Sequence, residues 1–274
     1  MKVLVTGAGG YIGRFVVQEL LNKGAEVLAC DINPAEINPR ARLLDVNILD
    51  GADDIYHKTD RPDICIHLAW KDGFNHNAPS HMGELSRHYF FLENIIKGGL
   101  SQLVVMGSMH EIGYHEGVVD EKTPCAPSSM YGIAKDALRR SAFLLSTGIT
   151  LQWLRAFYIY GDDARNQSIF TKLLKAEEEK KATFPFNTGK NKYDFIHVEE
   201  LARQISAVAM QKDISGIINC CSGKPIALAD MVETFIKERN MKIRLEYGVF
   251  PDRPYDSPAI WGSDEKIRKI KVGM

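Results

Sequence analysis

A glycine-rich turn between the first strand and the first helix is the feature that most constrains the fold. The short apolar run Lys2–Val5 is typical of a buried strand, and Tyr11–Leu21 carries apolar residues at helical spacing. Between and within them stand Gly7, Gly10 and Gly13, which permit a tight turn, close approach of backbone to a pyrophosphate, and close helix packing. The helix N-terminus adds N–H groups and a positive dipole end. The sequence therefore predicts a strand–turn–helix unit that binds an anionic group.

The second strand completes this unit. Val27–Cys30 is again strand-like and ends on Asp31, about twenty residues after the glycines, where dinucleotide-binding folds place an acidic residue. A carboxylate there accepts hydrogen bonds from adenosine ribose hydroxyls and repels a 2′-phosphate. We therefore expect NAD(H) as the cofactor in preference to NADP(H).

Strands and helices continue to alternate along the first 160 residues. Further β-type runs lie at Leu43–Leu44, Ile64–Leu68, Leu103–Met106 and Leu151–Leu154, and helical stretches at 82–97 and 131–145. This order predicts the α/β class, with a Rossmann-type doubly wound parallel sheet covered on both faces. From about Tyr160 the elements become shorter and richer in proline and charge. We expect a NAD-binding domain at 1–160 and a smaller C-terminal substrate-binding lobe at 161–274, interleaved with the first domain.

Composition excludes several classes of partner. The 274 residues contain 34 bases and 35 acids, a formal net charge of −1 that argues against a nucleic-acid binder or a basic membrane-surface protein. No apolar run approaches the roughly 20 residues of a membrane span, and the first strand leaves no room for a signal peptide. The five cysteines and the histidines His76, His81 and His88 lack ligand-like spacing. We expect a cytoplasmic protein with reduced thiols and no metal.

Tyr131 and Lys135 are the first candidates for catalysis. Four residues apart on a helix, they lie on one face, and an ammonium beside a phenol favours the phenolate and lowers the phenol pKa. Ser108 follows the predicted strand Leu103–Met106 and can bring a hydroxyl to the same place. Hydroxyl, phenol and ammonium beside a dinucleotide form a proton-relay set for hydride transfer at a carbinol or ketone.

With these residues the chain resembles the extended short-chain dehydrogenase/reductase family, also called the NAD-dependent epimerase/dehydratase family, whose members modify nucleotide sugars. The resemblance covers almost the whole chain. Its markers are Thr6–Gly13, Asp31, Asp45-Val46, His67-Leu68-Ala69, Gly107-Ser108, Tyr131–Lys135, Leu154-Arg155, Tyr160-Gly161, Asp194–Val198 and Arg253–Trp261, with Lys266 beyond them.

The resemblance implies roles for individual residues. Tyr131 would be the general acid/base, Lys135 would lower its pKa and hold the nicotinamide ribose, Ser108 would bind the reacting oxygen, and Arg253 would hold a nucleotide diphosphate. The implied cofactor-binding residues are Gly7, Gly9, Gly10, Tyr11, Ile12, Gly13, Asp31, Asp45, Val46, Leu68, Ala69, Trp70, Tyr131 and Lys135. The implied substrate-binding residues are Ser108, Met109, His110, Arg155, Tyr158, Arg253 and Asp256. The family also implies a homodimer through the helices at 82–97 and 131–145.

Departures from the family pattern bear on the reaction. The 4,6-dehydratases carry Thr-Asp-Glu where this chain has Ser108-Met109-His110, so dehydration is disfavoured, although Glu111 lies one residue further along. Two reactions remain: reduction of a nucleotide-linked 4-keto-6-deoxyhexose with Tyr131 as general acid, and epimerisation at C4. We favour the 4-ketoreductase. A dinucleotide-binding regulator without catalysis is the third alternative, and the presence of both Tyr131 and Lys135 argues against it.

Overall fold

The computed structural model describes residues 1–161, 168–251 and 256–272. Its centre is a seven-stranded sheet in the order β11-β7-β5-β4-β1-β2-β3, and every neighbouring pair in it is parallel. The strands are β1 Lys2–Thr6, β2 Glu26–Cys30, β3 Arg42–Leu43, β4 Ile64–His67, β5 Gln102–Ser108, β7 Thr150–Ala156 and β11 Gly216–Cys220. The order reverses direction at β1, so the carboxyl ends of β1 and β4 form the crevice where such sheets bind ligands.

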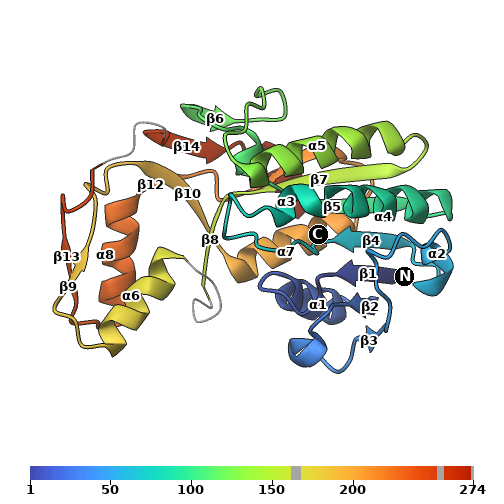
Figure 1. Cartoon of the computed structure of the whole chain (residues 1–274), viewed down its shortest axis with the longest axis horizontal. Coiled ribbons are helices and arrows are strands. Elements are labelled where there is room, and N and C mark those ends of the chain that lie inside the picture. The colour runs from blue at the N-terminus through green and yellow to red at the C-terminus, as the bar shows by residue number, and fades with distance from the viewer. Residues whose placement is uncertain (162–167, 252–255, 273–274) are drawn as a thin grey trace.

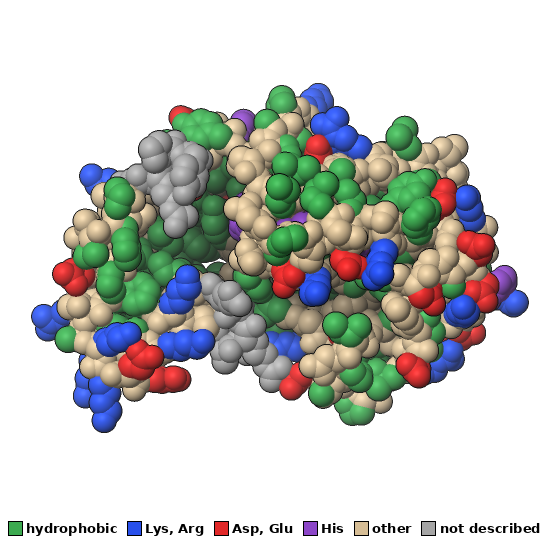
Figure 2. All heavy atoms as spheres, viewed as in Figure 1, with side chains coloured by type: hydrophobic (Ala, Val, Ile, Leu, Met, Phe, Trp, Pro, Cys, Tyr) green, Lys and Arg blue, Asp and Glu red, His purple; other side chains and the backbone are tan. Residues whose placement is uncertain are grey.

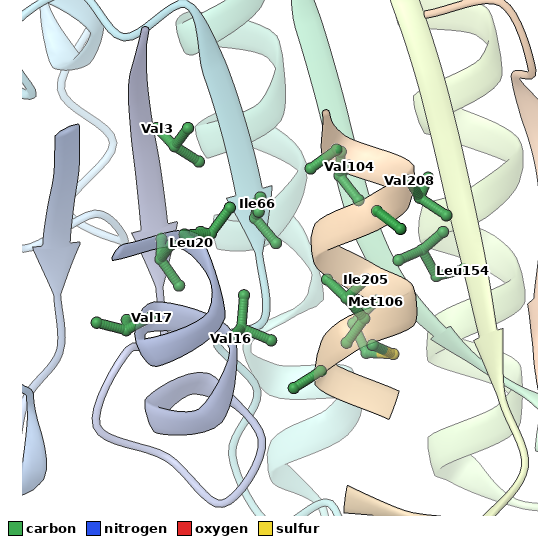
Figure 3. Close-up of a cluster of buried hydrophobic side chains, with 14 of the residues drawn as sticks. Val3, Val16, Val17, Leu20, Ile66, Val104, Met106, Leu154, Ile205 and Val208 are labelled. Carbon is green, nitrogen blue, oxygen red and sulfur yellow. The ribbon is translucent and has the colours of Figure 1, made fainter. Parts of the chain in front are cut away.

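Helices cover both faces of this sheet, which confirms the doubly wound fold predicted from the sequence (Figure 1). One face packs against α1 Gly13–Asn22, α7 Val198–Ala209 and α9 Glu265–Val272. Figure 3 shows α1 and α7 here, with Val16, Leu20 and Ile205 among the side chains that meet the sheet residues Ile66 and Val104. The other face packs against α2 Ile55–Lys58, α4 Leu85–Lys97 and α5 Met130–Leu145. Both faces are apolar because both are buried.

A smaller lobe with its own apolar core lies beside the sheet (Figure 1). Its five-stranded sheet has the order β12-β10-β14-β6, with β8 paired to β10. The strands are β6 Gly117–Val119, β8 Tyr158–Tyr160, β10 Lys192–His197, β12 Pro225–Ala227 and β14 Ala259–Gly262. A two-stranded sheet of β9 Thr183–Pro185 and β13 Arg244–Glu246, and the helices α6 Ile169–Glu178 and α8 Leu228–Glu238, complete the lobe.

The two lobes exchange segments, so the sheets do not divide the chain at residue 160. Strand β6, from the first 160 residues, pairs with β14 of the small lobe, while β11 joins the large sheet beside β7. Helices α7 and α9 also pack on the large sheet. The chain is divided in this way because strands far apart in the sequence pair with one another, and local periodicity does not reveal such pairing. The remaining elements are α3 Ser80–Gly83 and the short 3-10 helices η1 Pro34–Glu36 and η2 Met109–Glu111.

No helix in the described parts of the chain is long and apolar enough to cross a membrane.

Candidate active site

The glycine turn forms a cradle at the carboxyl end of β1. The amides of Gly7 and Ala8 donate to the carbonyl of Cys30, and Gly10 donates to the carbonyl of Gly7 at 3.1 Å. A Cβ on Gly13 would lie 2.0 Å from the Gly7 oxygen, and one on Gly9 would lie 2.3 Å from the Asn33 oxygen. The turn therefore requires glycine at both positions.

Helix α1 begins directly after this turn. Its N-cap is Ile12, which has no polar side chain to accept an N–H group of the first turn. Tyr11 extends from the turn toward the end of β8, where its hydroxyl donates to the Gly161 carbonyl at 2.5 Å. The start of a helix above a glycine cradle suits the diphosphate of a dinucleotide.

Asp31 lies beside the cradle at the end of β2. One carboxylate oxygen accepts the Gly9 N–H at 2.9 Å and the other accepts the Asn33 N–H at 2.8 Å. These bonds fix the carboxylate against the glycine turn, and its half-buried position leaves lone pairs for ribose hydroxyls.

Four further residues implied for the cofactor lie on the loops after β3 and β4. Leu68 and Ala69 follow β4, and their amides donate to Thr6, the first to its carbonyl at 3.1 Å. Ala69 lies so close to Gly7 that a Cβ added to Gly7 would lie 2.7 Å from the Ala69 nitrogen. Asp45 is exposed and Val46 half-buried on the loop after β3. All four lie at the carboxyl ends of the strands, around the cradle.

Ser108 and Tyr131 meet at the end of β5. The Ser129 side chain accepts the Gly132 N–H and starts α5, which places Tyr131 in the first turn of the helix. Ser108 accepts the His110 N–H with its hydroxyl oxygen and hydrogen-bonds Tyr131. The Ser108 hydroxyl keeps its own proton, which can donate toward the phenol.

Lys135 takes a different position from the one expected. Its Nζ donates to the Met106 carbonyl at 2.8 Å and lies 3.7 Å from the centre of the Trp70 ring, but 5.9 Å from that of Tyr131. Burial lowers the pKa of Lys135 to about 7, with the Glu111 charge opposing this change.

The pKa of Tyr131 also departs from the expectation. Burial raises the pKa of Tyr131 to about 12; the hydrogen bond from Ser108 opposes this rise and the Glu111 charge adds to it. The sequence predicts a lowered value, because it places an ammonium next to the phenol. In the structure burial dominates, and the lysine charge is directed at Trp70 instead.

Aromatic and histidine side chains surround this pair, although the sequence pattern predicts no shared role for them. The His76 ring lies parallel to the Tyr131 ring, with centroids 5.4 Å apart, and 4.1 Å from the His110 ring. Trp70 donates to His81 at 3.0 Å and stacks on His88 at 4.5 Å. No sequence spacing signals this cluster, because its members come from three separate segments. Within the described ranges, no three His, Cys, Asp or Glu side chains are arranged to hold a metal.

Arg155 and Glu111 are the residues whose positions differ most from expectation. The sequence analogy places Arg155 on the substrate, but its side chain is 1% exposed. Its guanidinium contacts Glu111 at 3.3 Å, the Asp120 carbonyl at 3.1 Å and the Cys125 sulfur at 3.2 Å. The Glu111 carboxylate is fully buried among these partners, so it is not available to a substrate as a dehydration acid or base.

Of the remaining substrate candidates, Tyr158 and Met109 lie at the junction with the small lobe. Tyr158 on β8 lies 6.5 Å from the His110 ring, and the charge of Asp256 contributes to a raised Tyr158 pKa, behind the larger effect of burial. Met109 is buried in the apolar core of the small lobe. Arg253 lies outside the described residues. Figure 2 shows the surface hollowed between the two lobes, with histidine side chains at its edge.

Comparison with known proteins identifies the family. The model of the NAD dependent epimerase/dehydratase family matches residues 3–221. The chain belongs to this family. It is 45% identical, over 96% of its length and 100% of the relative's, to a dTDP-6-deoxy-L-talose 4-dehydrogenase (NAD(+)) of Aggregatibacter actinomycetemcomitans. It is 24% identical to a UDP-glucose 4-epimerase of Corynebacterium glutamicum, over 98% of this chain and 89% of that one.

Solved structures agree on the fold. A UDP-glucose 4-epimerase of Thermus thermophilus in complex with NAD superposes with a TM-score of 0.82 at 20% identity, covering 98% of this chain and 92% of that one. MoeE5 in complex with UDP-glucuronic acid and NAD gives a TM-score of 0.81 at 23% identity, covering 98% and 92%. The family and the fold expected from the sequence are thereby confirmed, and the chain is an NAD-dependent enzyme.

The residues present fit NAD. The cradle of Gly7, Gly9 and Gly13 leaves room only for backbone and ligand, as the contacts of an added Cβ show. The Asp31 carboxylate is fixed against this cradle and can accept ribose hydroxyls, and Ser108 and Tyr131 lie at the end of β5, at the same edge of the sheet.

Proposed function

We propose that the protein interconverts a 4-hydroxyl and a 4-ketone on a dTDP-linked 6-deoxyhexose, with NAD(H) as the hydride carrier. The observation that carries this proposal is the 45% identity, over the full length of the relative, to a dTDP-6-deoxy-L-talose 4-dehydrogenase. The preference for ketoreduction drawn from the sequence names one direction of this reversible reaction. We propose the reversible reaction, because nothing in the described part of the site restricts the enzyme to reduction.

The chain's own residues divide the work of the proposed reaction. Bound NAD(H) supplies the hydride acceptor for oxidation and the hydride donor for reduction. Tyr131 removes the hydroxyl proton during oxidation and returns it to the oxygen during reduction. Ser108, hydrogen-bonded to Tyr131, orients the reacting oxygen. The rings of His76 and His110 enclose the phenol, and this exclusion of water strengthens each hydrogen bond in the site.

The second candidate is a C4 epimerase, favoured by the 4-epimerases among the relatives. An epimerase returns the hydride to the same sugar, so added cofactor is not consumed. The test is to supply dTDP-6-deoxy-L-talose with NAD⁺, and the corresponding 4-keto sugar with NADH. Stoichiometric NADH formation and consumption is the expected result, whereas interconversion of 4-epimers without net cofactor change would contradict it.

NADPH should support a lower rate than NADH, because the Asp31 carboxylate repels a 2′-phosphate.

We also propose that the protein is a homodimer formed through α4 and α5. Phe90, Ile133, Phe143 and Leu144 on these helices are 48%, 40%, 38% and 83% exposed, and Figure 2 shows hydrophobic side chains gathered over this face. Such a patch is typical of an interface between subunits. Sedimentation equilibrium should give twice the chain mass, and Leu144→Glu should shift the protein toward monomer. A monomeric wild-type protein at micromolar concentration would contradict the proposal.

A further inference from the structure

Glu111 is a buried carboxylate with an unusual set of partners beside the catalytic serine. Its Oε1 accepts the backbone N–H of Ser108 at 2.7 Å. The indole N–H of Trp153 donates to both carboxylate oxygens, at 2.9 and 3.1 Å. Arg155 Nε lies 3.3 Å from Oε2, and the side chain of Glu111 has no exposed surface. Both carboxylate oxygens are thus held by fixed donors.

These bonds hold the end of β5 in a defined conformation. Ser108 and Glu111 form a reciprocal capping box around η2, in which each side chain accepts the backbone N–H of the other. A Cβ on Gly107 would lie 2.5 Å from Glu111 Oε1 and 2.1 Å from Trp153 Nε1, so the carboxylate packs directly on the strand. The Ser108 backbone therefore cannot move without breaking the bond to Glu111.

The charge of Glu111 also acts on the proton-relay pair. Facing groups come from every element around it: Arg155 on β7, Tyr131, Lys135 and Arg139 on α5, and Cys125 on the loop before α5. Burial raises the pKa of Glu111, while the charges of Arg155 and Arg139 and the bonds from Ser108 and Trp153 favour its ionised form. Arg155 and Arg139 also offset part of the negative charge. The remainder favours the protonated forms of both Tyr131 and Lys135, because a negative charge disfavours a phenolate and favours an ammonium.

We propose that Glu111 is a positioning residue of the proton relay: its carboxylate fixes Ser108 against Tyr131, and its buried negative charge acts on the phenol. This role deepens the proposed function and rests on it for its kinetic consequences. Glu111 does not contact the sugar; it acts through Ser108 and through its charge.

Two substitutions separate the two parts of the proposal. Glu111→Gln keeps the length and an acceptor for the Ser108 N–H but removes the charge. Glu111→Asp keeps the charge but moves the carboxylate back by one methylene. We expect Glu111→Gln to shift the ionisation of Tyr131 to lower pH, and Glu111→Asp to leave it near the wild-type value. Glu111→Asp should lower kcat by about tenfold or more through displacement of Ser108, with KM changed less.

The ionisation is measured without any substrate, by ultraviolet difference titration of tyrosinate in the holoenzyme. Subtraction of the Tyr131→Phe titration isolates this residue from the other nine of the ten tyrosines. Asp194→Asn is the matched control. Asp194 is also a fully buried carboxylate, and it accepts the backbone N–H groups of Ser222, Gly223 and Gly262 in the small lobe. The Asp194→Asn substitution should lower the stability of the protein and leave the Tyr131 titration unchanged.

The result that supports the proposal is a lower titration midpoint in Glu111→Gln alone, matched by the midpoint of the pH profile of kcat/KM. An unchanged midpoint in a folded Glu111→Gln protein, an unchanged kcat in a folded Glu111→Asp protein, or an equal midpoint shift in Asp194→Asn overturns it. If neither Glu111 variant folds, the residue is structural and the assignment also fails. Lack of wild-type turnover on the dTDP sugars would count against the proposed function, while the titration would still decide the role of Glu111.

Discussion

Tyr131→Phe should lower kcat by about 10² to 10⁴-fold, because it removes the general acid/base of the proposed reaction. The phenol hydrogen-bonds Ser108, and burial raises its pKa to about 12. Oxidation needs the phenolate, so wild-type kcat/KM for oxidation should rise with pH below that value. Reduction needs the protonated phenol and should lose activity only as the pH approaches it. The measurement is NADH formation and consumption across a pH series.

The Tyr131→Phe protein provides its own check on this interpretation. Its residual activity should no longer depend on pH through the Tyr131 ionisation, and its affinity for NADH should stay close to wild type. The ring remains in place to pack against His76, so stability should change little. Retention of more than about a tenth of the wild-type kcat would show that another group transfers the proton.

Gly13→Ala should disrupt both the fold at the cradle and the binding of NAD. The new Cβ would lie 2.0 Å from the Gly7 oxygen and 2.9 Å from the Ala8 Cα, which are backbone atoms that cannot rotate away. Helix α1 must then move off the turn, at a cost of about 1 to 3 kcal/mol in the free energy of unfolding. Because the same movement displaces the diphosphate cradle, we expect the Kd for NADH to rise by about tenfold or more.

The comparison for this variant is Gly83→Ala. Gly83 is exposed at the end of α3, and nothing lies within 4 Å of a Cβ built there. This change should be neutral or slightly stabilising, because alanine restricts the unfolded chain. For both variants, thermal unfolding gives the change in stability and NADH fluorescence titration gives the Kd for NADH. Equal behaviour of the two variants would remove the steric argument for the cradle.

Local patterns were enough to predict six of the seven strands of the large sheet. The glycine turn, the strand ending at Asp31 and the helix carrying Tyr131 all occur where the sequence indicates, because periodicity and turn residues act within a few positions. The sequence predicts that the two lobes are interleaved, but that β6 and β11 are the strands exchanged between the two sheets was not predictable in this way. The exchange depends on pairing between strands distant in the chain, for which neither strand carries a local signal.

The candidate site shows the same division between what local sequence determines and what tertiary contacts determine. By itself the sequence determined the fold class, the family and the residues gathered at the strand ends, since glycine stereochemistry and the Tyr-x-x-x-Lys spacing are properties of short segments. Only the tertiary structure decided that Arg155 is the counter-ion of Glu111, that Lys135 lies on Trp70, and that burial raises the Tyr131 pKa. Those outcomes depend on which groups lose water and which charges remain close, and residues distant in sequence determine both.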